Sequence, residues 1–357
     1  IATSRERLNL REESAFGVRG LEYPADEVTT DAEVLTSPRS ARSASSYSAI
    51  ELFGQHARRV HSSFSLSEAE MPDVLRICQL VEGLPLGIEL AASWTRIRSC
   101  GEIADEIEHN LDVLATDLRN VPERQRSIEA TFEHSWRLLS SAEQDLLARL
   151  SIFSGGFHPD AALQVTGASL STLLALADKS LLTRVAPRRY DMHNLLKQYA
   201  LEKLDTDPQI RRETELCYAR YFTAFLDKQA ERIRAPRGKE DFDELAAEIE
   251  NTRQAWRLAV AHDRARLVDK SLEPLYLFYH SRCRFQEGID LFSRAIDRWR
   301  GDPGQSHVLG RLLSHRGALD LQLCHYPEAR AALEESLALL EPLGATVDQI
   351  FGLVKLA

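Results

Sequence analysis

The residue patterns that support catalysis are missing from this sequence. A loop that cradles nucleotide phosphates needs GxxxxGK[ST], in which glycines let backbone N–H groups reach the phosphates while the lysine and hydroxyl hold charge and Mg²⁺. The one Gly-Lys pair, Gly238 and Lys239, is followed by Glu240 between helical patterns, which indicates a solvated loop. The patterns HExxH and GxSxG and a metal-spaced set of cysteines are also missing. We therefore predict no catalytic residue and no metal site in this chain.

The first residues could still carry a ligand contact. The segment IATSRERL begins apolar and continues with Thr3, Ser4 and Arg5, which is typical of a strand end and the loop after it. A guanidinium at such a position can form charge-assisted hydrogen bonds to a phosphate. Taken alone, Arg5 is better explained as an ordinary surface arginine, and only its place after an apolar start favours a phosphate contact.

Two later segments place unusual residues at helix starts. GLPLGIELAA puts Gly83, Leu84 and Pro85 at a turn that opens a strongly apolar helix, and proline is tolerated at the first helical position. MHNLLKQYALEKL puts His193 at the beginning of another helix, where a ring N–H and the helix dipole can both favour an anion. A first-turn proline needs no functional explanation, so Pro85 alone leaves the question open.

Composition indicates a folded protein with two or three domains. Of 357 residues, 44% are hydrophobic and 27% charged, which is ordinary for a globular chain. A formal net charge of −10 should repel a phosphate backbone, which argues against nucleic-acid binding. The five cysteines form no CxxC pair, and neither a long apolar run nor a signal peptide is present, so we predict a reduced, cytoplasmic protein without membrane contact. The start at Ile1 and the end at Ala357 inside a helical pattern suggest a fragment of a longer protein.

Helical periodicity dominates from about residue 47 onward. A group of short helices, then a hairpin around Ala186 and Pro187, then a final helix is the order typical of a winged-helix module. The predicted helices include 71–81, 127–139, 142–152, 159–165, 169–179, 193–204, 213–233 and 242–260, and the predicted strands are 180–185 and 189–192.

The C-terminal part contains an internal repeat. Aligning FQEGIDLFSRAI on YPEARAALEESL pairs Phe285 with Tyr326, and the small and large apolar positions that follow also coincide. The separation of 41 residues lies in the range of helical-hairpin solenoids. A third unit should begin near Thr346, and since about three units are needed for a continuous core, the array is expected to continue beyond the fragment.

Taken together, the three segments resemble those of the STAND class of signal-transduction ATPases, which includes the NB-ARC proteins. The resemblance is in particular to bacterial multidomain transcriptional regulators that carry a nucleotide switch and C-terminal tetratricopeptide repeats. It covers nearly the whole chain, because HSWRLLSSAEQDLLARLSIFSGGF also resembles the start of the family's winged helix.

The resemblance implies a role for each segment. Arg5 matches the phosphate sensor of the TSR motif, Pro85 matches the GLPL proline that packs on the nucleotide base and sugar, and His193 matches the MHD histidine that contacts the β-phosphate of ADP. Asn194 stands where the family usually has aspartate, and asparagine can still cap a helix start. The supporting residues are Thr3, Ser4, Gly83, Leu84, Met192 and Asn194.

The implied fold is mostly α, with a helical domain and a winged helix followed by a solenoid of tetratricopeptide-like hairpins. The implied domains are the end of a nucleotide-binding domain (1–24), a helical domain with the GLPL motif (47–120), a winged helix with the MHD-like motif (125–205), a helical linker (206–262) and the repeats (263–357).

The resemblance also implies a regulatory cycle. ADP or ATP with Mg²⁺ would bind the longer parent protein, which would act as a slow ATPase switch, whereas this fragment alone would bind no nucleotide and catalyse nothing because the Walker A and B segments would lie before Ile1. A protein or small-molecule inducer would bind the repeats, and activation would involve self-association. DNA would be contacted only through a domain outside this chain.

Two other functions remain open at this point. One is a nucleotide-independent tetratricopeptide scaffold for protein binding. The other is direct DNA binding through the winged helix, although its last helix offers only Lys197 and Lys203 as cations.

Overall fold

The computed structural model describes residues 18, 20–24, 47–62, 64–115, 126–234 and 240–356. Their contacts divide the chain into two compact units: unit 1 comprises Ile1–Ser151 and Ala168–Asp207, and unit 2 comprises Ile152–Gly167 and Pro208–Ala357. The sensor segment with Thr3, Ser4 and Arg5 lies outside the described residues.

The first half of unit 1 is a small helical bundle. It consists of α3 (Ser48–Val60), α4 (Met71–Leu80), α5 (Pro85–Ser93) and α6 (Cys100–His109), with α3 packed on α5 and α4 packed on α6. A capping box starts α6, where Ser99 accepts from the Glu102 N–H and the Glu102 carboxylate accepts in return from the Ser99 N–H. The apolar faces predicted from the sequence form its core, including Ile50, Phe53, Val74, Ile77 and Ile88.

The second half of unit 1 holds three helices, a hairpin and a final helix. The elements are α7 (Ile128–Arg137), α8 (Ser141–Leu150), α10 (Leu170–Asp178), β1 (Thr183–Ala186), β2 (Arg189–Asp191) and α11 (Asn194–Asp205). The predicted hairpin is present, but its turn lies one residue later than predicted. Ala186 pairs with Arg189 inside the ladder, and Arg188, directly after Pro187, has a positive φ of 58°, as the second central residue of a type II turn does.

Unit 2 is entirely helical in its described part. Its elements are α9 (Pro159–Thr166), α12 (Pro208–Arg234), α13 (Glu240–Ala247), α14 (Ile249–Ala261), α15 (Ala265–Ser281), α16 (Phe285–Trp299), α17 (Ser306–Gln322), α18 (Tyr326–Leu340) and α19 (Thr346–Leu356). The single helix predicted over 242–260 is wrong, because Glu248 leaves helical geometry (φ −107°, ψ 10°) between α13 and α14. Its carboxylate accepts a hydrogen bond from Asn251 Nδ2 at 2.6 Å, which stabilises the break.

Asn251 is the polar centre of the first part of unit 2. This side chain is 1% exposed, and its Oδ1 accepts hydrogen bonds from the backbone N–H of Ser154 at 3.1 Å and from the Tyr218 hydroxyl at 2.9 Å. Its Nδ2 also donates to the Gly156 carbonyl at 3.1 Å. These bonds fix the turn before α9 onto α14, which explains why 152–167 groups with unit 2.

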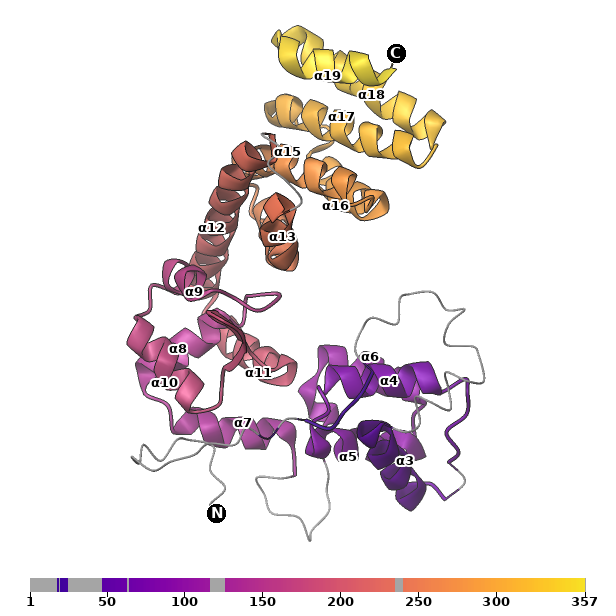
Figure 1. The fold of residues 1–357 in the computed structure, drawn as a ribbon, viewed down its shortest axis with the longest axis vertical. Helices are drawn as coiled ribbons and strands as arrows, with labels where there is room; N and C mark the ends of the chain where they lie inside the picture. The colour runs from indigo at the N-terminus through magenta and orange to yellow at the C-terminus, as the bar shows by residue number, and fades with distance from the viewer. Residues whose placement is uncertain are drawn as a thin grey trace. The chain divides into compact units, whose positions relative to one another are not determined.

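The predicted repeat is confirmed. Phe285 and Tyr326 begin α16 and α18, which are the second helices of two successive hairpins, and Figure 1 shows α16, α17 and α18 lying one above another. Phe292 and Leu333, which the alignment pairs, are both fully buried. A Cβ on Gly288 would lie 2.6 Å from Leu319 Cδ1, so the small residue lets two helices approach closely. The predicted mostly α fold with a helical solenoid is thus confirmed.

Two properties of the described residues bear on other classes of protein. No single described helix is long and apolar enough to cross a membrane, and one pair, α9 with α10, meets that test only when the two short helices are counted together. No group of histidine, cysteine and carboxylate side chains in the described part could hold a metal ion.

Candidate functional site

The GLPL turn is held in place by its backbone. Gly83 has a φ of +67°, and its carbonyl accepts a hydrogen bond from the Leu21 N–H at 2.8 Å. A Cβ at Gly83 would lie 2.2 Å from the Leu21 carbonyl oxygen, so only glycine fits there. Pro85 is the first residue of α5, as predicted, and its ring is exposed, while Leu84 is half-buried. The turn therefore has a fixed backbone, with Pro85 at its end and Glu82 directly before Gly83.

His193 occupies the N-cap of α11. Its Nδ1 accepts a hydrogen bond from the Leu195 N–H at 3.2 Å. Because Nδ1 is the acceptor, the neutral ring carries its proton on Nε2. Nε2 is buried and forms no well-aligned hydrogen bond with a described residue. Burial lowers the pKa of His193, whereas the Glu82 carboxylate and the Val81 backbone oppose this shift. The ring therefore offers a buried N–H donor whose present neighbours, Val81 and Glu82, belong to the GLPL turn.

The GLPL turn and the start of α11 meet through Glu82. Its Oε1 accepts a hydrogen bond from the Asn194 N–H at 2.7 Å, and its Oε2 lies 3.8 Å from His193 Nε2. A carboxylate at a helix N-terminus is stabilised both by the free N–H groups and by the helix dipole. Glu82 thus joins two segments that are 112 positions apart in the sequence.

A lysine completes the charged part of this junction. Lys197 follows His193 by one helical turn, so both side chains lie on the same face of α11. Burial lowers the pKa of Lys197, against the raising effects of Asp191 and Glu82. Lys197 forms no ion pair with any described residue. The junction therefore holds two groups that could be cationic, His193 and Lys197, with Glu82 and Asp191 beside them.

The structure brings together only part of the predicted site. The GLPL turn and His193 lie together, and Met192 beside them is buried. Asn194 does not cap α11 as we expected, because His193 holds the cap position and the Asn194 side chain is exposed. Sequence reasoning missed Glu82 and Lys197. Their positions, directly before GLPL and four residues after His193, were the available signals.

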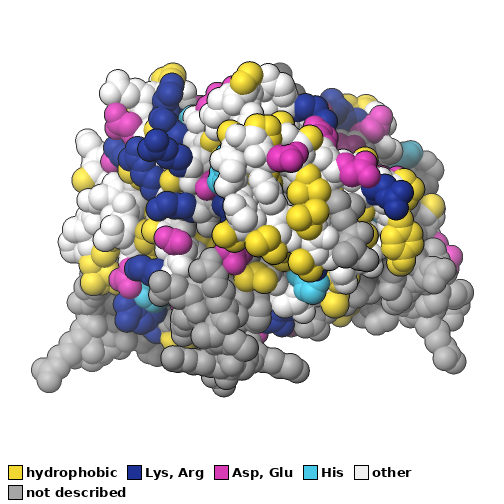
Figure 2. Space-filling view, turned by 90° about the horizontal axis from the view of Figure 1, so that it is seen from above, with side chains coloured by type: hydrophobic (Ala, Val, Ile, Leu, Met, Phe, Trp, Pro, Cys, Tyr) yellow, Lys and Arg dark blue, Asp and Glu magenta, His cyan; other side chains and the backbone are white. Residues whose placement is uncertain are grey.

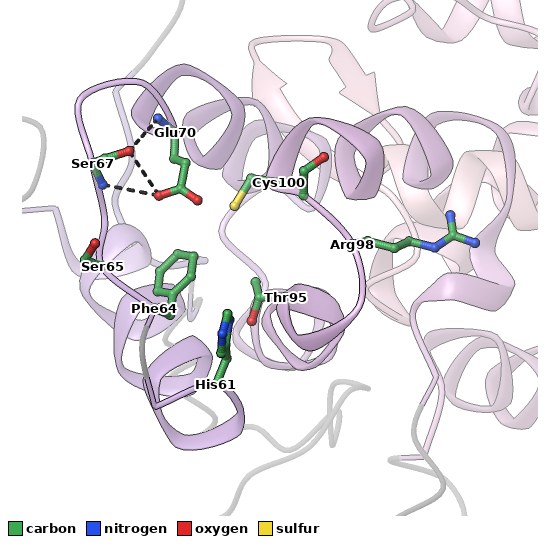
Figure 3. A pocket seen from close by; sticks show the side chains of 9 residues that line it. His61, Phe64, Ser65, Ser67, Glu70, Thr95, Arg98 and Cys100 are labelled. Carbon is green, nitrogen blue, oxygen red and sulfur yellow. Dashed lines mark hydrogen bonds between the residues drawn. The ribbon is translucent and has the colours of Figure 1, made fainter.

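A separate pocket of about 380 Å³ lies in the helical bundle of unit 1, away from this junction (Figure 3). Phe64, His61 and Thr95 face one another across it, whereas Arg98 points away. Its lining residues are His61, Phe64, Ser65, Ser67, Glu70, Thr95, Arg98, Ser99 and Cys100.

Ser67 and Glu70 bond to each other in this pocket, and the thiol of Cys100 is unreactive. Ser67 donates from its hydroxyl to the Glu70 carboxylate at 3.1 Å and also accepts from the Glu70 N–H. Burial, and after it the charges of Glu70 and Asp73, raises the pKa of the Cys100 thiol to about 12, so no thiolate nucleophile forms at neutral pH. The junction at α11 is therefore the better candidate for function.

Comparison with known proteins points to bacterial regulators. No model of a known protein family matches the chain. The chain is 30% identical over 319 residues to a protein of Mycobacterium tuberculosis named "Putative HTH-type transcriptional regulator", which corresponds to 83% of this chain and 35% of that protein. It is 32% identical over 161 residues to the regulatory protein AfsR of Streptomyces griseus, covering 40% of this chain and 15% of AfsR. The chain thus spans about a third of the first of these relatives.

One solved structure was also matched. It is a crystal structure of a STAND protein with a tetratricopeptide repeat sensor from Pyrococcus horikoshii, with 12% sequence identity and coverage of 86% of this chain and 56% of that one. The TM-score is 0.21, which is below the level at which two folds correspond. The sequence relatives alone therefore carry the comparison, and they support a regulatory role.

Proposed function

We propose that this chain is the regulatory part of a nucleotide-dependent switch in a bacterial transcriptional regulator. The observation that carries this proposal is the buried Nε2–H of His193 at the start of α11, facing the GLPL turn. An N–H donor beside a helix N-terminus suits a phosphate group. The names of the sequence relatives support the regulatory half of the proposal.

In the proposed cycle, ADP with Mg²⁺ binds the longer protein and its β-phosphate accepts from His193. Pro85, exposed on the turn, packs against the base and sugar, and Arg5 distinguishes ATP from ADP through a γ-phosphate contact. Moving such a switch from 1:99 to 99:1 takes about 5.5 kcal/mol, more than one contact supplies. We therefore assign the remaining free energy to an inducer bound on the repeats and to self-association.

The test uses the longer protein that carries this chain. Purified protein is denatured, the released nucleotide is identified by chromatography, and the measurement is repeated with His193→Ala. Stoichiometric ADP in the wild type and a loss of at least about tenfold in the variant are expected, because a charge-assisted hydrogen bond contributes about 1.5–3 kcal/mol.

A matched control separates ligand binding from helix capping. His158 is the N-cap of α9 and accepts from the Asp160 N–H at 3.5 Å, the same role that His193 has in α11. His158→Ala should keep its nucleotide. No nucleotide in the wild type and no binding of added ADP or ATP would sink the proposal.

The second candidate function is a scaffold that works without nucleotide. Ile350 and Val354 on α19 are 54% and 67% exposed, and each lies 41 residues after a buried residue of α17, Leu309 or Leu313. Because α18 packs on α17, this face of α19 is the one that a further hairpin of the array would cover. Figure 2, seen from the α19 end of Figure 1, shows hydrophobic side chains among charged ones. A scaffold would bind its partner equally well with and without nucleotide, which the longer protein can test.

DNA binding through the hairpin and α11 gains no support from the cations of α11, whereas the hairpin does expose Arg184 and Arg188. Lys203 donates to Glu133 at 3.1 Å, and Lys197 is half-buried beside Glu82, so neither cation is displayed for phosphate contacts. DNA binding therefore remains a prediction. A steep loss of affinity for DNA with rising salt would support it.

A further inference from the structure

Glu82 lies two residues after the end of α4, and its φ of +47° belongs to an ordinary helix end. The Gly83 N–H donates to the Cys78 carbonyl at 3.0 Å and the Glu82 N–H donates to the Gln79 carbonyl at 3.0 Å, which closes the helix. Other residues take the same conformation after α10, α14, α15 and α17, namely Ser180, Asp263, Cys283 and Cys324, so the side chain of Glu82 is what distinguishes it. Here the contacts that use the side chain are those to Asn194 and His193.

The two carboxylates of the junction, those of Asp191 and Glu82, accept hydrogen bonds from different parts of the chain. Asp191 Oδ1 accepts from the Met192 N–H at 2.8 Å, so it fixes the chain just before α11. Glu82 comes from the other segment and reaches the free N–H groups of α11 from outside. Around it lie a helix N-terminus, the buried Nε2–H of His193 and the half-buried amine of Lys197, all of which favour a negative charge.

We propose that the Glu82 carboxylate is the protein's own occupant of the anion position at the start of α11. It ties the GLPL turn to α11 when no ligand is present, and a phosphate group that reaches His193 displaces it. The displacement by phosphate rests on the proposed function, whereas the contact between Glu82 and α11 does not.

Two consequences follow from this arrangement. In this arrangement the contact between the turn and α11 needs no nucleotide, because Glu82 supplies the anion itself. A phosphate must also compete with the Glu82 carboxylate for the hydrogen-bond donors at the start of α11, because two anions that share these donors repel each other. Glu82 therefore lowers the affinity for nucleotide, and its removal leaves His193 and Lys197 in need of an external anion.

The first arm of the test measures amide hydrogen exchange in the 357-residue chain without nucleotide. Glu82→Ala should speed exchange at the Asn194 amide by about tenfold, since a hydrogen bond to a charged acceptor is lost. Glu82→Gln keeps an acceptor oxygen and should give a smaller increase. The control is Glu89→Ala, which removes another carboxylate near a histidine, His56 at 3.3 Å, far along the chain from α11. Unchanged exchange at Asn194 in Glu82→Ala would overturn the proposed contact between the Glu82 carboxylate and α11, which we call the latch.

The second arm adds millimolar inorganic pyrophosphate as the probe. In Glu82→Ala, pyrophosphate should slow amide exchange at Asn194 and Leu195 again. In the wild type it should slow exchange less, because the Glu82 carboxylate already accepts from the N–H groups at the start of α11. Adding Lys197→Met to Glu82→Ala should remove most of this protection. If pyrophosphate protects neither protein, the displacement is wrong.

The two arms also separate this inference from the proposed function. Faster exchange in Glu82→Ala together with a longer protein that carries no nucleotide would keep the latch and reject the switch. Normal exchange in Glu82→Ala together with ADP lost in His193→Ala would keep the switch and reject the latch.

Discussion

The hairpin stack of unit 2 and the α11 junction of unit 1 are stabilised in opposite ways. In the stack, apolar residues at matching positions of successive hairpins, such as Phe292 and Leu333, are fully buried. In the junction, Glu82, His193 and Lys197 meet through charge and hydrogen bonds. The stack should therefore supply stability, and the junction should respond to ligands at little cost to stability. The predictions below test that division, from the largest expected effect to the smallest.

Phe292→Ala should destabilise unit 2 most. Phe292 is fully buried, with its ring centroid 5.5 Å from that of Trp256 and 6.4 Å from that of Tyr279. Loss of the ring leaves a cavity, so the free energy of unfolding should fall by about 3–5 kcal/mol. Denaturant titration followed by circular dichroism measures it. Val347→Ala, at a residue 81% exposed, is the control and should change stability by less than about 0.5 kcal/mol.

Asn251→Ala should have the next largest effect. It leaves the Ser154 N–H, the Gly156 carbonyl and the Tyr218 hydroxyl without their buried partner. We expect a loss of about 2–3 kcal/mol from the same titration, because unsatisfied buried polar groups cost about 1–3 kcal/mol each and part of that is regained by relaxation. Tyr218→Phe removes only one of these bonds and should cost less. Equal losses in both variants would show that Asn251 does not organise this turn.

Glu133 should make the stability of unit 1 depend on acid pH. The Tyr199 hydroxyl, with Arg137 and Lys203, holds the pKa of Glu133 at about 2. A carboxyl whose folded pKa is depressed contributes stability that is present above its unfolded pKa and lost as pH falls toward the folded value. Stability should therefore decline by about 1 kcal/mol between about pH 5 and pH 2, a figure reduced for the partial exposure of the side chain. In Glu133→Gln this part of the decline should disappear, whereas Glu106→Gln should keep it.

His193→Ala should have the smallest effect on stability. The loss is one N-cap bond, the 3.2 Å contact from the Leu195 N–H, and we expect about 1 kcal/mol or less. Thermal unfolding of the 357-residue chain measures it, with His158→Ala at the start of α9 in unit 2 as the matched cap variant. A loss as large as that of Phe292→Ala would mean that the junction is a structural core and would remove the contrast with the stack.

The sequence predicted the stack better than the junction because the two use different information. Repeated apolar positions such as Phe285 and Tyr326 act through packing at a fixed period, which is visible along the chain. Pro85 and His193 were placed at their helix starts for the same local reason, since caps and first-turn residues follow local rules. The contact of Glu82 with α11 joins residues 112 positions apart, and no local rule predicts it.

By itself the sequence determined the mostly α fold, the hairpin before α11 and the 41-residue repeat, because periodicity and turn residues are local properties. Tertiary structure alone decided that the segment before α9 is fixed by Asn251, that Asn194 is exposed rather than the cap of α11, and that Glu82 provides the anion beside His193. The contacts of Asn251 and Glu82 depend on a side chain reaching a backbone group distant in sequence. Burial and charge at such points exist only once the chain has folded.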